Sequence, residues 1–416
     1  MKMLKSGWPL HLGLVAAGLL IAGQVSATEV EVMHWWTSGS ESAAVAQFKT
    51  KYESKGYQWK DVAAGGGDNE RILLKSRLLK GNPPAAAIID TDVKQFDVDR
   101  SKLADLNQLA AQQHWDSVLP TIVQHYVKIN GQYVAVPVNV HRQNVMWISV
   151  AAMKKIGASE PPKTWADWFV LADKAKAAGI MPLAAAENWT TTELFQQIAY
   201  GSLGADGYRK AFYEGNAEAL QGSSMIKAFQ TLRRIKPYTD KAASTRTWDA
   251  ATHMVIEGKA LSQAMGDWAK GEFLMAKQKP GQDFLCVPMP GTSTGFLFNV
   301  DAFMFFKVKD QDQQAQNALA TTFMSKDGQE AFNKIKGSVP VRTDADMSQF
   351  DDCGKQSHAD FLATAKSGTL TMAAEQLASP ARVSGWEDVV QAFWASDDMT
   401  PEQAAEKMAA VAKANK

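Results

Sequence analysis

The chain has few cysteines, no excess of either charge and no repeated segment. It contains 2 cysteines in 416 residues, and its 44 basic residues balance its 44 acidic residues. This balance excludes the basic profile of a protein that binds nucleic acid or a membrane surface. We find no internal repeat and no low-complexity tract, and the length suits two domains.

Only one long apolar run occurs, and it lies at the N-terminus. Lys2 and Lys5 precede an apolar stretch at 10–23, which is followed by the small residues 25–27. This order predicts a secretory signal peptide over 1–27 and a mature start at Thr28. The stretch is short for a membrane span, and no cysteine follows it, so we expect a soluble exported protein without a lipid anchor. The mature chain would carry 42 basic and 44 acidic residues, a charge near −2.

The two cysteines are Cys286 and Cys353. In an oxidising compartment an even pair usually forms a disulfide, and we expect one here. The alternative is a pair of buried free thiols. No histidine cluster accompanies them, so we predict no metal site.

Several catalytic and cofactor motifs are missing. Gly65, Gly66 and Gly67 precede a predicted helix, but their spacing matches neither the Walker pattern nor the dinucleotide fingerprint. We interpret them as a flexible loop rather than a phosphate site, and we predict no cofactor. The single Gly-x-Ser-x-Gly sequence, at 291–295, precedes a predicted strand rather than a helix, which argues against the nucleophile elbow of a serine hydrolase.

What the chain does have is an alternation of strands and helices, typical of the α/β class. The predicted strands are 30–34, 57–62, 85–90, 145–148, 181–186, 258–265, 284–288 and 296–306. Asn130-Gly131 predicts a hairpin turn within 126–138. A helix over 42–48 has Ser40 or Ser42 as a candidate N-cap, and Thr164 caps another.

Three predicted strands stop at corners that combine tryptophan with polar groups. They are Trp35-Trp36, Trp189 and Asp267-Trp268. Aromatic faces bind the C–H faces of sugar rings, and carboxylates bind sugar hydroxyls. A core role is the alternative for each tryptophan, and strand alternation allows one of Trp35 and Trp36 to be core while the other meets a ligand. Three corners in two halves of the chain indicate one shared cleft.

Four segments together resemble one known family. They are 32–41, 137–144, 265–268 and 336–342, and the resemblance extends over the whole mature chain. The chain resembles the family 1 extracellular solute-binding proteins, which capture sugars for bacterial ATP-binding-cassette (ABC) importers. Within that family it is most similar to the periplasmic glucose-binding proteins of Gram-negative bacteria.

The resemblance implies an α/β, two-lobed periplasmic binding protein of type II, with a hinge and an interlobe ligand cleft. The implied N-terminal lobe is 28–138 plus 299–345, and the implied C-terminal lobe is 139–298 plus 346–416. It implies a periplasmic monomer that captures glucose or a related hexose by lobe closure. The protein would then deliver the sugar to the permease of the importer. Whether a chemoreceptor or sensor is a further partner is left open.

The resemblance also implies the ligand-binding residues. They are Trp35, Trp36, Glu41, Asn299, Asp301 and Lys336 in the N-terminal lobe, His141, Trp189, Asp267 and Trp268 in the C-terminal lobe, and Asp92 and Lys94 after the third strand. Asn299 and Asp301 are expected on one face of a strand. We expect Trp36 or Trp268 to stack on the sugar, and we favour Trp36.

One departure from the glucose-binding relatives concerns the ligand. Those relatives carry a histidine near 372–380, where this chain has Glu375 and Gln376. A different hexose, an amino sugar or a short glycoside is therefore open, as are an oligosaccharide and a phosphorylated polyol. Only Lys336 and Arg142 are candidates for a phosphate, which favours a neutral sugar. A glycosidase using Glu41 with Asp267 or Asp301 is the enzyme alternative, and we expect no catalysis.

Overall fold

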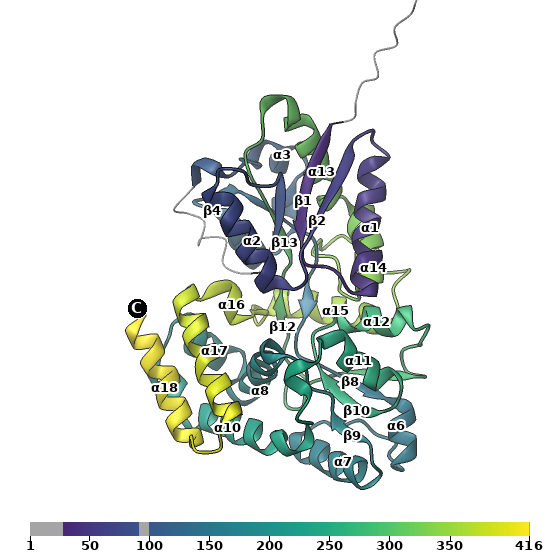
Figure 1. Cartoon of the computed structure of the whole chain (residues 1–416), viewed down its shortest axis with the longest axis vertical. Helices are drawn as coiled ribbons and strands as arrows, with labels where there is room; N and C mark the ends of the chain where they lie inside the picture. Colours follow the sequence, from purple (N-terminus) through teal and green to yellow (C-terminus); the bar gives the residue numbers. More distant parts are fainter. Residues whose placement is uncertain (1–27, 91–99, 416) are drawn as a thin grey trace, which may run out of the picture.

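The computed structural model describes residues 28–90 and 100–415. The predicted signal peptide, Asp92 and Lys94 lie outside these ranges. Two α/β lobes are stacked along the longest axis, with a narrow set of connections between them (Figure 1). The predicted fold class is confirmed.

The N-terminal lobe contains a five-stranded sheet in the order β2-β1-β3-β13-β6. Its strands are β1 (Glu29–His34), β2 (Gln58–Ala63), β3 (Ala86–Ile89), β6 (Ala135–Pro137) and β13 (Ala302–Phe305). The first three are parallel, and β13 is antiparallel to both β3 and β6. β3 and β13 are buried along their whole length, as expected for strands covered on both faces.

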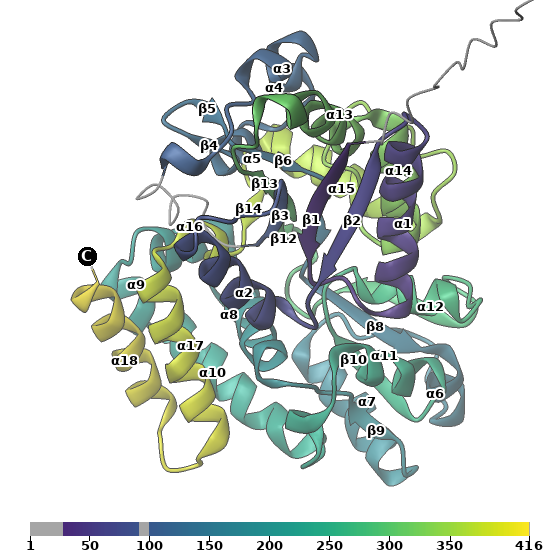
Figure 2. The ribbon, with the colours of Figure 1, turned by 45° about the horizontal axis from the view of Figure 1, so that its top comes forward.

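Helices and a hairpin cover this sheet. They are α1 (Gly39–Glu53), α2 (Gly67–Leu79), α3 (Asn107–Gln112), α4 (Trp115–Val118), α5 (Thr121–Tyr126), the hairpin β4 (Lys128–Ile129) and β5 (Gln132–Tyr133), η5 (Asp310–Asp312), α13 (Gln313–Met324) and α14 (Lys326–Lys336). In Figures 1 and 2, α1 and α14 lie side by side on one face, and α2 lies at the edge that faces the other lobe.

The C-terminal lobe contains a four-stranded sheet in the order β11-β8-β10-β9. The strands are β8 (Val145–Ser149), β9 (Met181–Leu183), β10 (Ala260–Ala264) and β11 (Phe284–Pro288). The helices are α6 (Val150–Lys155), α7 (Trp165–Ala177), α8 (Asn188–Tyr208), η2 (Arg209–Tyr213), α9 (Ala217–Gln221), α10 (Ser223–Ile235), η3 (Lys236–Tyr238), η4 (Ala243–Thr245), α11 (Trp248–Ile256), α12 (Ala269–Met275), α15 (Asp352–Ser367), α16 (Ala374–Leu377), α17 (Pro380–Ala395) and α18 (Pro401–Ala414).

A small sheet lies where the chain passes between the lobes. It has the order β14-β12-β7, formed by β7 (His141–Arg142), β12 (Leu297–Asn299) and β14 (Thr371–Met372). The predicted crossover at 139–144 is this segment: His141 pairs with Asn299 within the small sheet, and Val140 forms a bridge with Val339 of the N-terminal lobe. Chain segments from both lobes therefore meet at His141.

Local sequence signals correctly placed the hairpin turn after β4 and the start of α7. Asn130 and Gly131 both have positive φ, as the hairpin turn requires, and Thr164 caps α7 through Asp167. The predicted cap of α1 was wrong. Ser38, not Ser40 or Ser42, accepts a hydrogen bond from the Glu41 amide, and the Glu41 carboxylate bonds back to Ser38 in a capping box.

The returning segment 296–306 is not one strand. β12 ends at Asn299 in the small sheet, and β13 begins at Ala302 in the five-stranded sheet. The expectation that Asn299 and Asp301 share one face of a strand was therefore wrong, because the chain changes sheets between them.

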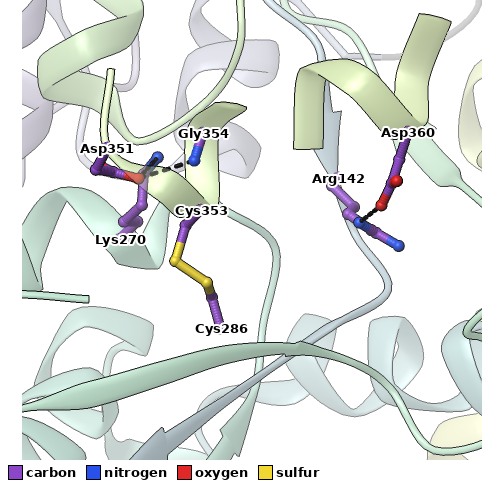
Figure 3. The surroundings of a disulfide bond; sticks show 7 residues. All are labelled: Arg142, Lys270, Cys286, Asp351, Cys353, Gly354 and Asp360. Atoms are coloured by element: carbon purple, nitrogen blue, oxygen red, sulfur yellow. Dashed lines mark hydrogen bonds and ion pairs between the residues drawn. A yellow bond between two sulfur atoms is a disulfide. The ribbon is translucent and has the colours of Figure 1, made fainter. Parts of the chain in front are cut away.

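The predicted disulfide is present. Cys286 of β11 is bonded to Cys353 of α15, with their Cα atoms 6.2 Å apart (Figure 3). Two ion pairs hold α15 and its N-cap nearby: Lys270 with Asp351 at 3.3 Å, and Arg142 with Asp360 at 2.7 Å. Further along α15, Phe361 belongs to the hydrophobic core of the N-terminal lobe.

No helix within 28–90 or 100–415 is long and apolar enough to cross a membrane. The lobe boundaries given above stay a prediction, and the packing of Phe361 shows that α15 contacts both lobes.

Candidate ligand site at the lobe boundary

The Trp35-Trp36 corner directly follows β1. Trp36 is 1% exposed, and its ring packs against Phe303 and Phe332 with centroids 5.5 and 4.9 Å apart. Trp35 is only partly buried. The core interpretation therefore applies to Trp36. The preference for Trp36 as the stacking indole loses its support, and Trp35 is the one of the pair with surface left for a ligand.

Glu41 and Lys336 form a buried ion pair beside this corner. Lys336 Nζ lies 3.0 Å from Glu41 Oε1, and the two residues are 2% and 6% exposed. Lys336 is the last residue of α14, where Gly337 adopts the left-handed conformation that ends the helix. The pair joins the start of α1 to the end of α14 and neutralises both charges.

The N-terminal end of α1 touches the other lobe directly. The Ser40 hydroxyl donates to Glu272 Oε1 of α12 at 2.6 Å, and the Ser40 amide donates to the same oxygen at 3.1 Å. A Cβ on Gly271 would lie 2.7 Å from Ser40 Oγ, so only glycine allows this approach. A Cβ on Gly337 would lie 2.5 Å from the Asp267 carbonyl. The Trp35-Trp36 and Asp267-Trp268 corners are therefore neighbours.

His141 is the centre of a buried network that joins three chain segments. Its Nδ1 lies 2.5 Å from Asp267 Oδ1, and its Nε2 lies 3.0 Å from Asp301 Oδ2. Asn139 donates to Asp301 Oδ2 at 2.8 Å, and the Arg142 amide donates to Asp267 Oδ2 at 3.0 Å. Three predicted site residues thus contact one another.

The charges in this network stabilise each other. Burial opposes protonation of His141, but the carboxylates of Asp301 and Asp267 outweigh it and raise the pKa of His141. Burial likewise opposes ionisation of Asp301, and the His141 charge outweighs it and lowers the pKa of Asp301. Both ring nitrogens of His141 are engaged by these carboxylates, which argues against a role as a general base.

Two tryptophans of the C-terminal lobe complete this corner. The Trp268 ring meets His141 edge to face at 5.0 Å and lies 6.2 Å from the Trp189 ring. A Cβ on Gly266 would lie 2.1 Å from the Trp268 ring, so glycine lets the indole fold back over its own backbone. Trp268 is 9% exposed and Trp189 is 41% exposed. Trp189 therefore offers the largest free aromatic face at the boundary.

Asn299 has a buried side-chain oxygen that no described residue bonds. It is 9% exposed, and its Oδ1 has no hydrogen-bond partner. A buried acceptor without a donor carries a desolvation penalty that a ligand hydroxyl would remove.

Sequence reasoning did not name Asp90 or Glu193 as site residues, and it noted Glu375 only because relatives carry a histidine there. Asp90 ends β3 and binds Arg71 of α2 at 2.9 and 3.1 Å. Glu193 of α8 accepts from the Gly266 amide at 3.1 Å, and Glu375 of α16 accepts from Gln143 at 2.8 Å. Asp90 could have been found, since it ends a buried parallel strand, where ligands bind in open α/β sheets. Glu193 follows Trp189 at helical spacing, but nothing in the sequence alone placed that face at the boundary.

The residues considered for a glycosidase or a phosphate site are already paired with other side chains. A glycosidase acid needs a carboxyl with a raised pKa. Glu41 is instead held in an ion pair, and the pKa of Asp301 is lowered. The two cations considered for a phosphate, Lys336 and Arg142, are paired with Glu41 and Asp360. Within 28–90 and 100–415, no cluster of three or more His, Cys, Asp or Glu side chains is placed to hold a metal ion.

Comparison with known proteins defines the class. A family model described as a bacterial extracellular solute-binding protein matches residues 43–360. The chain belongs to this family, so the predicted membership is confirmed.

Two similar relatives are named as probable sugar-binding periplasmic proteins. A probable sugar-binding periplasmic protein of Mesorhizobium japonicum is 43% identical over 371 residues, which cover 88% of this chain and 88% of the relative. A protein of the same name from Rhizobium meliloti is 41% identical over 410 residues, covering 97% and 98% of the two chains.

Solved structures with a similar fold include sugar receptors. The solute receptor AcbH is described as preferring b-D-galactopyranose. Its structure has a TM-score of 0.78 at 17% identity, and the match covers 93% of this chain and 99% of AcbH. Maltose-bound T. maritima MalE3 has a TM-score of 0.77 at 15% identity, with 93% and 99% covered. At these identities the likeness shows the fold alone.

Proposed function

We propose that the protein binds a sugar at the lobe boundary and delivers it to an ABC importer from the periplasm. One observation carries the proposal: Trp189, Trp268 and the bonded polar residues around His141 gather where the two lobes meet. The relatives named sugar-binding periplasmic proteins support the ligand class and the location.

Each group has a role suited to a sugar. The exposed Trp189 and the partly exposed Trp35 stack on the apolar ring faces, with Trp268 behind Trp189. Asn299 Oδ1 accepts from a hydroxyl, and Glu41, Asp301 and Lys336 form charge-assisted bonds to others. Asp92 and Lys94 after β3 stay among the proposed ligand residues. Neutral hydroxyls suit the described groups because Lys336 is already paired with Glu41.

The proposed ligand is a monosaccharide of the hexose class. Ser40 and Glu272 are in direct contact, and so are the Gly337 turn and the Asp267 corner. Contacts this close between the lobes favour a small ligand over an oligosaccharide. Binding by both lobes would shift the open form to the closed form, which takes about 5.5 kcal/mol of differential affinity for a complete switch.

Calorimetry with a panel of mono- and disaccharides tests this proposal. We expect one hexose to bind, and Trp189→Ala to weaken it about tenfold or more through loss of aromatic contact. Trp394→Ala, which removes an indole from the last turn of α17, is the matched control and should keep the affinity. If no sugar in the panel binds, the proposed function is wrong, and release of product from a glycoside would contradict a pure binding role.

A further inference from the structure

Two carboxylates lie along the first turns of α8 without a cationic partner. Glu193 is 6% exposed, and its Oε1 accepts from the Gly266 amide and from Gln197 Nε2, each at 3.1 Å. Glu375 is partly buried, and its two oxygens accept from Gln143 at 2.8 Å and from Gln196 at 3.0 Å. The two carboxylates are near enough that the charge of Glu375 raises the pKa of Glu193.

The position of this pair is at the proposed ligand site. Trp189 and Glu193 are four residues apart in α8 and share one face of the helix. Gly266, which binds Glu193, directly precedes Asp267 and Trp268. From the other lobe, Asp90 at the end of β3 is close enough to raise the pKa of Glu375. The carboxylates therefore lie between the tryptophan corner of one lobe and the β3 end of the other.

Within 28–90 and 100–415, no cationic side chain is paired with either carboxylate. Among the described residues, neither Glu193 nor Glu375 forms an ion pair, and burial raises the pKa of both, with Glu375 adding to the shift of Glu193. Three cations that the structure describes in this region pair with other carboxylates: Arg71 binds Asp90, Lys336 binds Glu41, and Arg142 binds Asp360. Uncompensated buried carboxylates are strongly unfavourable, so a cation or a proton must accompany them.

The same place has an excess of hydrogen-bond acceptors. Glu193 Oε2, Gln143 Oε1 and Gln197 Oε1 are buried and have no donor. The orientation of both amides is fixed, because their NH2 groups donate to the carboxylates of Glu375 and Glu193. What is missing is a group with several N–H or O–H donors.

We propose that the sugar bound at this boundary is an amino sugar, whose ammonium group is recognised by Glu193 and Glu375. This inference rests on the proposed function and narrows its ligand class. An ammonium group carries three donors and a positive charge, so it satisfies the free acceptors and compensates the carboxylates at once. A neutral hydroxyl supplies one donor and leaves the repulsion between the two carboxylates in place.

Calorimetry at neutral pH with three pairs of probes tests the inference: glucosamine against glucose, galactosamine against galactose, and mannosamine against mannose. We expect one amino sugar to bind about tenfold or more tightly than its parent hexose, the difference between charge-assisted and neutral hydrogen bonds. N-acetylation of that amino sugar removes the charge and should remove the advantage.

Two isosteric variants locate the effect. Glu193→Gln and Glu375→Gln should each weaken the amino sugar about tenfold and change the parent hexose by less than about threefold. Glu218→Gln removes one exposed charge from α9 and should change neither. Thermal melts check that each variant is folded.

Two results separate this inference from the proposed function. Equal or tighter binding of the parent hexose by the wild type overturns the amino-sugar inference and leaves sugar binding in place. Equal weakening of both sugars by Glu193→Gln also overturns it, because a neutral contact would then explain the role of Glu193. If neither sugar class binds, both proposals fail.

Discussion

At the scale of single residues, Glu70 is a buried acid without a partner. It is 0% exposed, and neither carboxylate oxygen has a hydrogen bond to any residue that the structure describes. Burial, together with the Asp90 charge, raises its pKa to about 8. The folded chain therefore binds this proton more tightly than the unfolded chain, whose carboxyl titrates near 4.5. Stability from this group is present at low pH and is lost as the pH rises from about 4.5 to about 8.

The effect of Glu70→Gln on stability should therefore depend on pH. The neutral amide should raise the unfolding midpoint at pH 8, where the carboxylate destabilises the fold, and change it little at pH 5. Calorimetric melts at the two pH values measure the difference. Glu53→Gln, an exposed position in α1, is the control and should show no such dependence. An equal shift at both pH values would show that Glu70 is not protonated in the folded chain.

Substitution of Trp36 should cost much more stability than substitution of Trp189. Trp36→Ala leaves a cavity between Phe303 and Phe332 and should lower the free energy of unfolding by about 3–5 kcal/mol. Trp189→Ala removes a side chain that is 41% exposed and should lower it much less. Denaturant unfolding of both variants gives the comparison. A Trp36→Ala variant as stable as wild type would contradict the core placement.

The sequence identified the tryptophan corners as candidate ligand contacts, but it did not show which tryptophan is core and which is exposed. Alternation along a strand separates Trp35 from Trp36 without saying which one faces the core, since the helices that cover the sheet decide that. Glu193 and Glu70 carry no local signal, because a glutamate in a helix is usually exposed. Only tertiary packing reveals that their carboxyls are buried.

At the scale of elements, α1 of one lobe can approach α12 of the other because residue 271 of α12 is a glycine. Gly271→Ala would place a Cβ 2.7 Å from Ser40 Oγ and 2.9 Å from the Ile335 carbonyl, so α12 must move away from α1. We expect weaker sugar binding and a larger radius of gyration in scattering, since the Ser40–Glu272 contact is lost.

Gly39→Ala is the matched control for that change. It lies on the same contact, but its Cβ would meet no atom closer than Glu272 Oε2 at 3.9 Å. Its affinity and scattering profile should stay close to wild type. Identical behaviour of the two variants would mean that the α1–α12 approach does not influence binding.

Elements with a clear periodicity were predictable, and the shortest ones were not. β1, β2, β3 and β8 lie within a residue or two of the predicted strands, because β-branched and apolar runs are a strong local signal. β7 and β14 have two residues each, too few for any period. The small sheet at the crossovers, which changes the direction of the chain between Asn299 and Ala302, could therefore not be read from the sequence.

At the scale of the whole molecule, the disulfide links β11 to α15 and closes a loop that passes through the N-terminal lobe. Replacing Cys286 and Cys353 by serine should lower the free energy of unfolding by about 4 kcal/mol, as expected when a loop of 67 residues is no longer closed. Reducing the wild type should give the same stability, measured by denaturant unfolding. Sugar affinity should persist in both. A reduced protein as stable as the oxidised one would contradict a stabilising role.

The exchange of chain between the lobes was predictable only through the family resemblance. β13 pairs with β3 and β6 although more than 160 residues separate it from either, and local patterns contain no information about such pairing. That information came from the four segments at 32–41, 137–144, 265–268 and 336–342. They occur in the order typical of a family whose two-lobed fold is confirmed.

The disulfide has a consequence for the integrity of the molecule. The 67-residue loop between Cys286 and Cys353 contains β12, β13, α13 and α14, so it includes the central strand β13 and the helix that carries Lys336. A protease that cuts anywhere in this loop leaves two fragments that are still covalently linked. A nicked receptor would therefore stay one molecule, with β13 in its sheet and Lys336 beside Glu41, until a reductant separates the pieces.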